Sequence, residues 1–348
     1  MRDLTSWSTP EGETLEWLLE PRDPAVRHLA LRELLDRSAD DLEVAEARHA
    51  AMAADPIAAI LAAQHPDGWW EKPGPGYATK YRGTVWQLIF LDQLGADPVD
   101  ARIRRACDYV LDHSRASSGG FGASGRIDAQ APPPSAVIHC LNGNLLNALI
   151  GLGWLPDQRL QAAIEWQARA ITGEGVERWY ASGTCGPRFA CAANEGLDCG
   201  WGAVKAMLGL GRIPAGDRSP LVRRAIGVGV DFLLGHDPAV ADYPMGWGNT
   251  RPSGSWFKLG FPSGYVTDVL QTVEALCRLG LAGDPRLRPA LDWIASRRDA
   301  RGRWRNEYAY NAKTWVDIER QGAPSKWVTL RALRVLRAAG AAVSPAEG

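Results

Sequence analysis

Apolar residues occur on nearly every side of five stretches of the chain: 81–94, 137–152, 194–210, 265–279 and 326–339. A helix that is apolar all round is a buried helix. In four other stretches the apolar residues form a single stripe at helical spacing, which is typical of a helix with one face in solvent. These stretches are 99–113, 157–170, 219–234 and 286–297. The pattern predicts inner helices that alternate along the chain with outer helices.

The boundaries between these stretches recur. Four Leu-Gly pairs each close an apolar run and lead within five residues into a proline, and they are separated by 58, 58 and 69 residues. The pairs are Leu94-Gly95, Leu152-Gly153, Leu210-Gly211 and Leu279-Gly280. Loops with a glycine beside a large aromatic residue follow several outer stretches. A period of this length predicts repeated helical hairpins.

The N-terminal part adds the helical stretches 23–37, 40–52 and 56–64, which gives about six inner and six outer helices in the alternating pattern. Short loops allow such hairpins to close into a ring, which buries the inner set. We therefore expect one all-α domain over 1–348, an α6/α6 toroid with a central cavity. Residues 1–55 would complete the ring, and the aromatic and acidic loop 300–325 would form a lid.

Polar residues gather at the starts of the inner stretches. Because all inner helices of a toroid run in the same direction, we expect these amino ends to meet at one mouth, where free N–H groups and helix dipoles attract an anion. Aromatic side chains, among them Phe261, would line an apolar cavity beneath it. The predicted substrate-binding residues are Lys80, Tyr81, Arg82, Trp86, Cys140, Asn142, Asn144, Asn194, Trp201, Lys205, Tyr265, Lys326 and Trp327. The alternative is that these side chains cap helices or join them, as Asn142, Asn194, Ser325 and Thr329 would.

Acid-base chemistry needs titratable groups in the cavity. The candidates are Asp198 and Asp268 at inner-helix starts, Glu307 in the lid loop, and the thiols of Cys191 and Cys199, which a helix amino end can acidify. Each has a structural alternative: a helix-dipole partner, an ion pair, or an inert buried thiol. The loop 183–188 is predicted to form a second lid.

The segment Gln64-His-Pro-Asp-Gly-Trp-Trp70 and the loop Gly302-Arg-Trp304 resemble the Gln-x-x-x-Gly-x-Trp element of the squalene-hopene cyclase and prenyltransferase repeat superfamily. This resemblance implies an α6/α6 toroid with a central cavity. The catalytic motifs of the superfamily are missing. Ser38-Ala-Asp-Asp41 lacks the first acid of Asp-x-Asp-Asp, and Asp198-Cys199 lacks the Asp-x-Cys spacing of the zinc enzymes. We therefore expect no metal and no cofactor.

The chain is also similar to linalool dehydratase-isomerase in approximate size and helical make-up. That resemblance implies cysteine and acid residues acting as acid-base groups on a terpene alcohol. It draws attention to Cys140, Cys185, Cys191 and Cys199.

Composition narrows the function classes. The 348 residues are 46% hydrophobic and 23% charged, which suffices for a large core. The net charge of -1 gives no basic surplus for nucleic acid. No stretch approaches the length of a membrane span, so we expect a cytoplasmic protein. Six cysteines without a Cys-x-x-Cys pair indicate reduced thiols. A homo-oligomeric state is left open.

These observations favour a lyase or isomerase of the terpenoid cyclase-like class. It would isomerise, dehydrate or cyclise an isoprenoid or another small amphiphile with an anionic or hydroxyl head. One alternative is a carbohydrate-active toroid, a glycosidase or lyase with tryptophan platforms and two carboxylates. Another is a non-catalytic helical-repeat protein that binds a partner in its ring.

Overall fold

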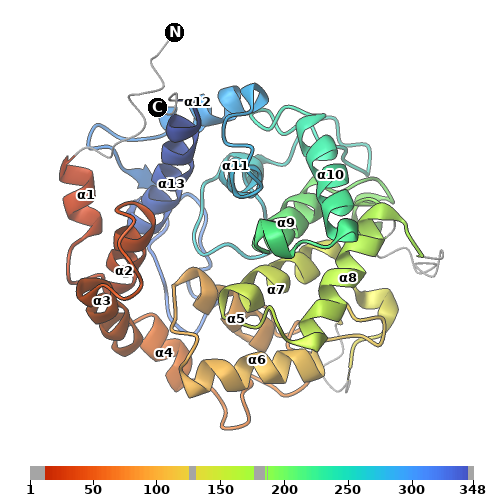
Figure 1. The fold of residues 1–348 in the computed structure, drawn as a ribbon, viewed down its shortest axis with the longest axis horizontal. Coiled ribbons are helices and arrows are strands. Elements are labelled where there is room, and N and C mark those ends of the chain that lie inside the picture. Colours follow the sequence, from red (N-terminus) through yellow and green to blue (C-terminus); the bar gives the residue numbers. More distant parts are fainter. Residues whose placement is uncertain (1–11, 125–130, 176–184, 186, 344–348) are drawn as a thin grey trace.

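The computed structural model describes residues 12–124, 131–175, 185 and 187–343. Its helices form two concentric rings (Figure 1). The inner ring consists of α2 (Pro24–Glu33), α5 (Thr84–Gln93), α7 (His139–Gly151), α9 (Gly200–Gly211), α11 (Val269–Arg278) and α13 (Lys326–Val343). The outer ring consists of α1 (Gly12–Leu18), α3 (Leu42–Ala53), α4 (Ile57–Ala62), α6 (Ala101–His113), α8 (Gln158–Thr172), α10 (Pro220–Leu234) and α12 (Arg288–Ser296). The predicted all-α toroid is confirmed.

The inner helices pack in ring order. Helix α5 packs on α7, α7 on α9, α9 on α11, α11 on α13, and α13 on α2, so the last helix closes the ring against the N-terminal part of the chain. A two-stranded antiparallel ribbon, β1 (Trp304–Arg305) with β2 (Pro324–Ser325), precedes α13. Within the described part of the chain, no helix is both long and apolar enough to cross a membrane.

Every predicted inner and outer helix is present, but several inner helices begin later than expected. Helix α11 begins at Val269 because Asp268 caps it, its carboxylate accepting a hydrogen bond from the Gln271 backbone N–H at 2.8 Å. Helix α9 begins at Gly200 behind the cap residue Cys199. The polar residues ahead of these helices therefore lie in loops. Helix α1 was not predicted as a separate element.

Three of the Leu-Gly pairs end helices in the way the sequence suggests. Gly95, Gly153 and Gly280 have φ angles of 71°, 90° and 89°, a left-handed conformation that favours glycine. Gly211 instead lies inside α9 as its last residue. The third pair therefore differs from the other three, although it occupies the same place in the repeat.

The two Gly-Trp loops make matching contacts at opposite ends of the sequence. The buried indoles of Trp70 and Trp304 each donate to the carbonyl of the residue ten positions earlier, at 2.7 Å in both cases. Their backbone N–H groups donate to the hydroxyls of Thr84 and Thr329, at 3.1 and 2.9 Å. The same arrangement in both loops shows that they are equivalent members of one repeat.

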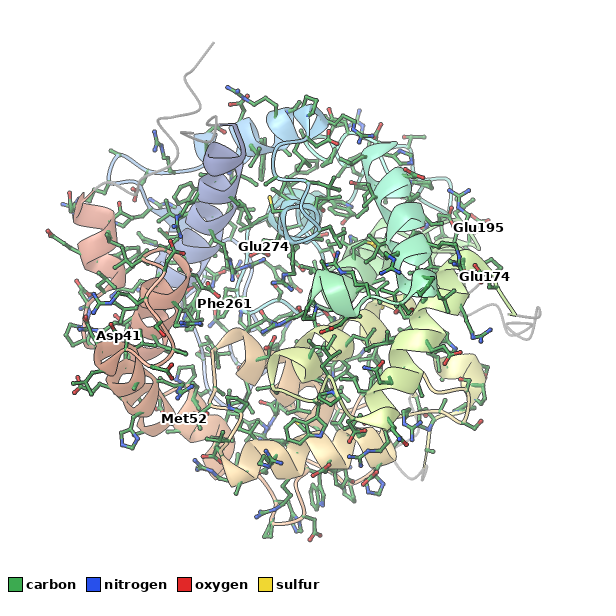
Figure 2. The ribbon with its side chains drawn as sticks, viewed as in Figure 1. Asp41, Met52, Glu174, Glu195, Phe261 and Glu274 are labelled. Atoms are coloured by element: carbon green, nitrogen blue, oxygen red, sulfur yellow. The ribbon has the colours of Figure 1, made fainter. Side chains whose placement is uncertain are left out.

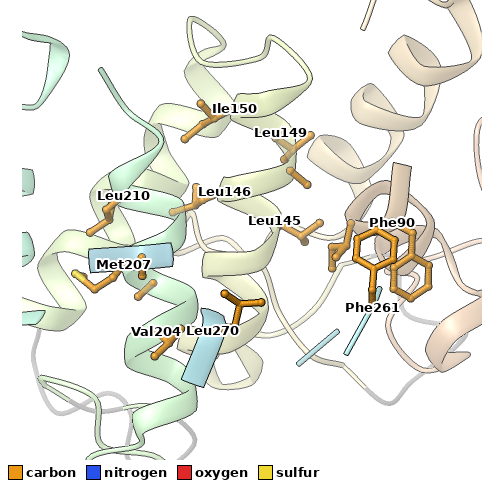
Figure 3. Packing of buried hydrophobic residues seen from close by; sticks show 14 of the residues in the cluster. Phe90, Leu145, Leu146, Leu149, Ile150, Val204, Met207, Leu210, Phe261 and Leu270 are labelled. Atoms are coloured by element: carbon orange, nitrogen blue, oxygen red, sulfur yellow. The ribbon is translucent and has the colours of Figure 1, made fainter. Parts of the chain in front are cut away.

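Helices α7 and α9 touch backbone to backbone. A Cβ atom placed on Gly143 would lie 2.4 Å from the carbonyl carbon of Lys205, and one on Gly209 would lie 2.7 Å from the carbonyl oxygen of Gly143. Leucine and methionine side chains fill the space on either side of this crossing (Figure 3). The contact fixes α9, and with it the position of Lys205, against α7.

Candidate functional site

A cavity of about 820 Å³ lies inside the ring, at the carboxyl ends of the inner helices. Its wall includes Asp92 from the end of α5, Asn147 from the last turn of α7, Arg212 directly after α9, and Arg278 at the end of α11. Helix α13 contributes residues along most of its length, from Trp327 to Ala338. The carboxyl ends of α5, α7, α9 and α11 therefore meet at one end of the ring, and the cavity extends from there to Trp327 near the amino end of α13.

Basic side chains outnumber acidic ones in this wall. The basic residues are Arg32, Arg48, Lys205, Arg212, Arg278, Arg331 and Arg334, and the acidic ones are Glu33, Asp92 and Glu274. Figure 2 shows Glu274 and Phe261 toward the middle of the ring, and Asp41 and Met52 on its rim. A cavity lined in this way favours a negatively charged ligand.

Glu274 is tied to two of these arginines. Its carboxylate accepts from Arg331 at 2.5 and 3.0 Å and from Arg334 at 3.1 Å. Burial by itself would raise the pKa of Glu274, but the two guanidinium groups outweigh it and lower the pKa to about 2. Glu274 is therefore a carboxylate at neutral pH and has no proton to donate.

Arg278 has no such partner. Its guanidinium donates to the side-chain oxygen of Asn147 at 2.6 Å and to the carbonyl oxygen of Leu208 at 3.2 Å. Among the described residues, no carboxylate lies within 4.0 Å of it. Burial, together with the positive charges of Arg212 and Arg334, lowers the pKa of Arg278 to about 10. An anion at this point would relieve the repulsion among the three arginines.

Asp92 makes a direct ion pair with Arg212. Their side chains form an ion pair at 2.9 Å, and the Asn147 amide donates to the same carboxylate at 3.2 Å. Only 4% of the Asp92 side chain is exposed, and burial raises its pKa against the effect of Arg212 and Arg278. One carboxylate thus faces two arginines at this end of the cavity.

Lys205 reaches the cavity from the middle of α9 and is 1% exposed. Its ammonium donates to the side-chain oxygen of Gln271, whose amide nitrogen donates in turn to Asp268 at 2.9 Å. Burial lowers the pKa of Lys205 to about 7, although the charge of Asp268 opposes this shift. Burial also raises the pKa of Asp268. The two residues named from the sequence are thus joined through Gln271, one helical turn after Asp268, which sequence reasoning missed.

Aromatic side chains supply part of the cavity wall. The rings of Phe261 and Trp327 stack at 4.5 Å with an angle of 3° between their planes, and both line the cavity. Leu208 and Leu330 extend this apolar side. The cavity therefore combines a cationic end with an apolar wall, which suits an amphiphile.

The amino ends of the inner helices also meet, but an aromatic cluster fills the place where the anion mouth was predicted. Trp86 is fully buried and contacts Tyr77, Tyr81 and Tyr265, with ring centroids 5.3 to 6.1 Å apart. Lys80 lies over the Tyr77 ring at 4.5 Å. The described cavity includes the carboxyl ends of α5, α7, α9 and α11, and the predicted mouth at the amino ends stays a prediction.

Of the remaining predicted binding residues, one lines the cavity and the others make contacts that hold helices or loops in place. Asn144 lines the cavity and donates to the carbonyl of Gly264 at 3.1 Å. Asn142 joins α7 to α8, and Asn194 holds the loop at 244–246. Lys326 forms ion pairs with two acidic residues near α2 rather than joining the other cations. Trp201 and Tyr265 contact each other at the amino ends, at 6.1 Å.

Two of the predicted proton donors lie outside the cavity wall. Asp198 pairs with Arg188 at 3.1 Å and accepts from a backbone N–H. Glu307 forms an ion pair with Arg297 and accepts from the Leu259 backbone N–H at 3.0 Å. Both carboxylates therefore fix loops, as the structural alternative proposed.

The loop 300–325 covers the amino ends of the ring. The Trp315 indole donates to the Arg82 carbonyl at 3.0 Å, and the Arg82 guanidinium lies over the Trp315 ring at 4.0 Å. Tyr310 contacts Tyr81 at 4.0 Å. Half of the second predicted lid, 183–188, lies outside the described residues, namely 183, 184 and 186.

The cysteines also gather at the amino ends of α7 and α9. The Cys191 and Cys199 thiols share a hydrogen bond, which lowers the pKa of Cys191 to about 6 and raises that of Cys199 well above its usual value. Burial raises the pKa of Cys140 to about 12 and that of Cys185 well above its usual value. None of these four thiols belongs to the described wall of the central cavity. Their predicted catalytic role stays a prediction.

No family model and no curated protein matches the chain. Among solved structures it is similar to the type II terpene cyclase MstE from Scytonema. A variant of that enzyme in complex with geranylgeranyl dihydroxybenzoate is 16% identical over 90% of this chain and 78% of that chain, with a TM-score of 0.43. The apo enzyme is 14% identical over 86% and 98%, with a TM-score of 0.33. These likenesses are too weak to assign a reaction, and membership in the squalene-hopene cyclase superfamily stays a prediction.

Proposed function

We propose that the protein is an enzyme of the terpenoid cyclase-like class, a lyase or isomerase that acts by acid-base chemistry on an isoprenoid or another amphiphile with an anionic head. One observation carries this proposal. Arg278 faces an 820 Å³ cavity without a carboxylate within 4.0 Å among the described residues, beside the further cations Arg212 and Arg334. Arg278 is half-buried and makes no direct ion pair, although the charges of Glu274 and Asp92 act on it, so an anionic ligand would supply the direct contact that it lacks.

The cavity residues have three different roles in this proposal. The arginines at the carboxyl ends of the helices bind the anionic head, and the stacked rings of Phe261 and Trp327 contact the apolar body. Lys205 exchanges a proton with the ligand, because its lowered pKa leaves both protonation states populated near neutral pH. Gln271 and Asp268 hold the Lys205 side chain in place.

The two alternatives have less support. A glycosidase needs one carboxyl group that donates a proton and one that stays ionised. In the described cavity wall, Glu274 is the ionised carboxylate, and Asp92, although burial raises its pKa, is held in a direct ion pair with Arg212 rather than free to donate a proton. A pure binding ring would be expected to pair its buried charges internally, which Arg278 does not do.

The proposal is tested with farnesyl monophosphate and farnesol, which share an apolar body and differ in the head group. Titration calorimetry should show that wild type binds the phosphate more tightly. Arg278→Met should weaken phosphate binding by about 10- to 100-fold, as expected for the loss of a charge-assisted hydrogen bond, and leave farnesol binding nearly unchanged. Arg286→Met, which removes an exposed arginine paired with Asp284, is the matched control.

Turnover is followed by mass spectrometry and NMR of the recovered ligands and of other isoprenoid alcohols and phosphates. A rearranged or dehydrated product that wild type forms and Lys205→Met does not would support the acid-base assignment. Equal affinity of wild type and Arg278→Met for the phosphate, with no conversion of any ligand, would contradict the proposal.

A further inference from the structure

Lysine is rare in this chain, and one lysine occupies the centre of the ring. Of the 39 basic side chains, six are lysines and the others are arginines. Four lysines, at 72, 80, 258 and 313, are exposed, and Lys326 is buried in ion pairs with Glu20 and Asp23. The sixth is Lys205. An arginine keeps its charge at any physiological pH, whereas a lysine amine can become neutral and act as a nucleophile.

The surroundings of Lys205 favour the neutral amine. Its nitrogen has no carboxylate within 4.0 Å among the described residues, and it donates a hydrogen bond to the uncharged Gln271. The charged or titratable groups that act on it are Asp268, which caps α11, Glu274 from α11, Arg331 from α13 and Cys140 from α7. Glu274 forms ion pairs with Arg331 and Arg334, and these positive charges weaken its electrostatic attraction for the Lys205 ammonium.

The position of the amine is also fixed. Gln271 accepts from the Lys205 ammonium and donates to Asp268 at 2.9 Å, so the amide orientation is set by both contacts. The α7–α9 backbone contact at Gly143 holds the lysine backbone. A buried nucleophile whose position is fixed in the wall of a cavity is arranged as covalent catalysis requires.

We infer that Lys205 is a covalent catalytic residue that forms an imine with a ligand carrying an aldehyde or ketone group. This inference rests on the proposed function and narrows its substrate to carbonyl-bearing amphiphiles. The amine lone pair attacks the carbonyl carbon, the carbinolamine loses its oxygen as water, and the carbon becomes double-bonded to the Lys205 nitrogen. No oxidant or reductant is consumed.

The imine also accounts for isomerase chemistry. When protonated, the imine draws electrons from the neighbouring carbon, which loses a proton to water and so becomes part of an enamine. The electron pair of the enamine, shifted along an adjacent double bond, then takes up a proton from water at another carbon. Water then adds to the imine carbon, and the released product regains its carbonyl group while Lys205 regains its amine. The arginines at the cavity end hold the anionic head throughout.

The test uses the ω-oxo derivative of decanoic acid, which has a carboxylate at one end and an aldehyde at the other, with ω-hydroxydecanoic acid as the matched ligand without a carbonyl. Full-length protein is incubated with the aldehyde at pH 7 and treated with sodium cyanoborohydride, which reduces an imine to a stable amine. Intact mass and peptide mapping should show one adduct per chain, at Lys205. At pH 7 an exposed lysine has a neutral fraction roughly a thousand times smaller.

Two variants and one internal control make the result specific. Lys205→Arg keeps the cation but cannot form the imine, so the adduct should disappear while ω-hydroxydecanoate still binds with similar affinity. Lys258→Arg, at an exposed position, should leave the adduct unchanged. Lys326 is the internal control in wild type, since it is buried but held by two carboxylates and should stay unlabelled. Circular dichroism and thermal unfolding check that each variant is folded.

The outcomes separate the two proposals. If ω-hydroxydecanoate binds but wild type gives no adduct at Lys205, or labels all exposed lysines equally, the imine inference is overturned and the proposed function stands. If neither ligand binds, both are overturned. An adduct confined to Lys205 that ω-hydroxydecanoate suppresses by competition supports both.

Discussion

At the scale of single residues, two threonine hydroxyls anchor the two Gly-Trp loops to the inner helices. Thr84 and Thr329 accept the backbone N–H groups of the buried residues Trp70 and Trp304. Replacing either threonine by valine keeps the shape of the side chain but leaves a buried N–H group without a partner.

We predict that Thr84→Val and Thr329→Val each lower the free energy of unfolding by about 1 to 3 kcal/mol, measured by denaturant titration. Thr172→Val, near solvent at the end of α8, is the control and should change it by less than about 0.5 kcal/mol. If the two buried positions behave like the control, these hydroxyls do not anchor the loops.

Glu274 gives a pH-dependent prediction. Its folded pKa of about 2 lies below its ordinary value of 4.5, so the ion pairs contribute fully at pH values above 4.5 and are lost as pH falls from 4.5 toward 2. The stability difference between wild type and Glu274→Gln should therefore shrink by on the order of 3 kcal/mol over this interval. Exposed Glu46→Gln is the control. A constant difference for Glu274→Gln across these pH values would contradict the assignment.

The sequence predicted some cavity residues and missed others for a physical reason. Lys205, Asn144 and Trp327 stood out because polar or very large side chains are unusual in helices that are apolar all round. Arg212 and Arg278 did not stand out, because a basic residue at the end of a helix is the usual partner of its dipole. Only the closed ring shows that several such ends face one another.

At the scale of helices, the crossing of α7 and α9 sets how closely the inner ring can pack. A methyl group on Gly143 would meet the backbone of α9 rather than a side chain that could move aside. The two helices would have to separate, which would displace Lys205 from Gln271.

We predict that Gly143→Ala lowers the free energy of unfolding by about 1 to 3 kcal/mol or more, and reduces ligand binding in the cavity. Gly227→Ala on the outer helix α10, where a Cβ meets nothing within 4 Å, should be neutral or stabilise by up to about 1 kcal/mol. Urea unfolding of both variants measures the contrast. Similar effects at the two positions would show that the close approach is not important.

Helices were the most predictable elements, since apolar periodicity and the Leu-Gly turns define them directly. Their starts were less predictable. Residues such as Asp268 were read as part of the first turn, whereas the side chain caps the helix from outside. For the same reason, the amino-end residues drew attention as a mouth, and the packing of tyrosines over that end became visible only with the loop 300–325 in place.

At the scale of the whole molecule, the ring closes where α13 meets α1 and α2. Ion pairs cross this seam, among them Arg337 with Asp36 and Arg334 with Glu33. Leu18 of α1 is fully buried in the main core at the same place. Exposed ion pairs contribute little, whereas a buried leucine contributes several kcal/mol.

We therefore predict that Leu18→Ala lowers the free energy of unfolding by about 2 to 5 kcal/mol, and that Asp36→Asn, whose side chain is 70% exposed, has a much smaller effect. Thermal and urea unfolding of the two variants test this ranking. A larger effect for Asp36→Asn would mean that charge rather than apolar burial holds the seam.

The place of α13 in the inner ring has a consequence for synthesis of the protein. Helices α11 and α2 are partners of α13, yet they lie far before it in the chain. During translation, the apolar faces of α2 and α11 that pack on α13 stay exposed until residues 326–343 have been synthesised. Chains halted before that point would be substrates for chaperones and proteases, and could hold no ligand, because the wall to which Trp327, Arg331 and Arg334 belong would not yet exist.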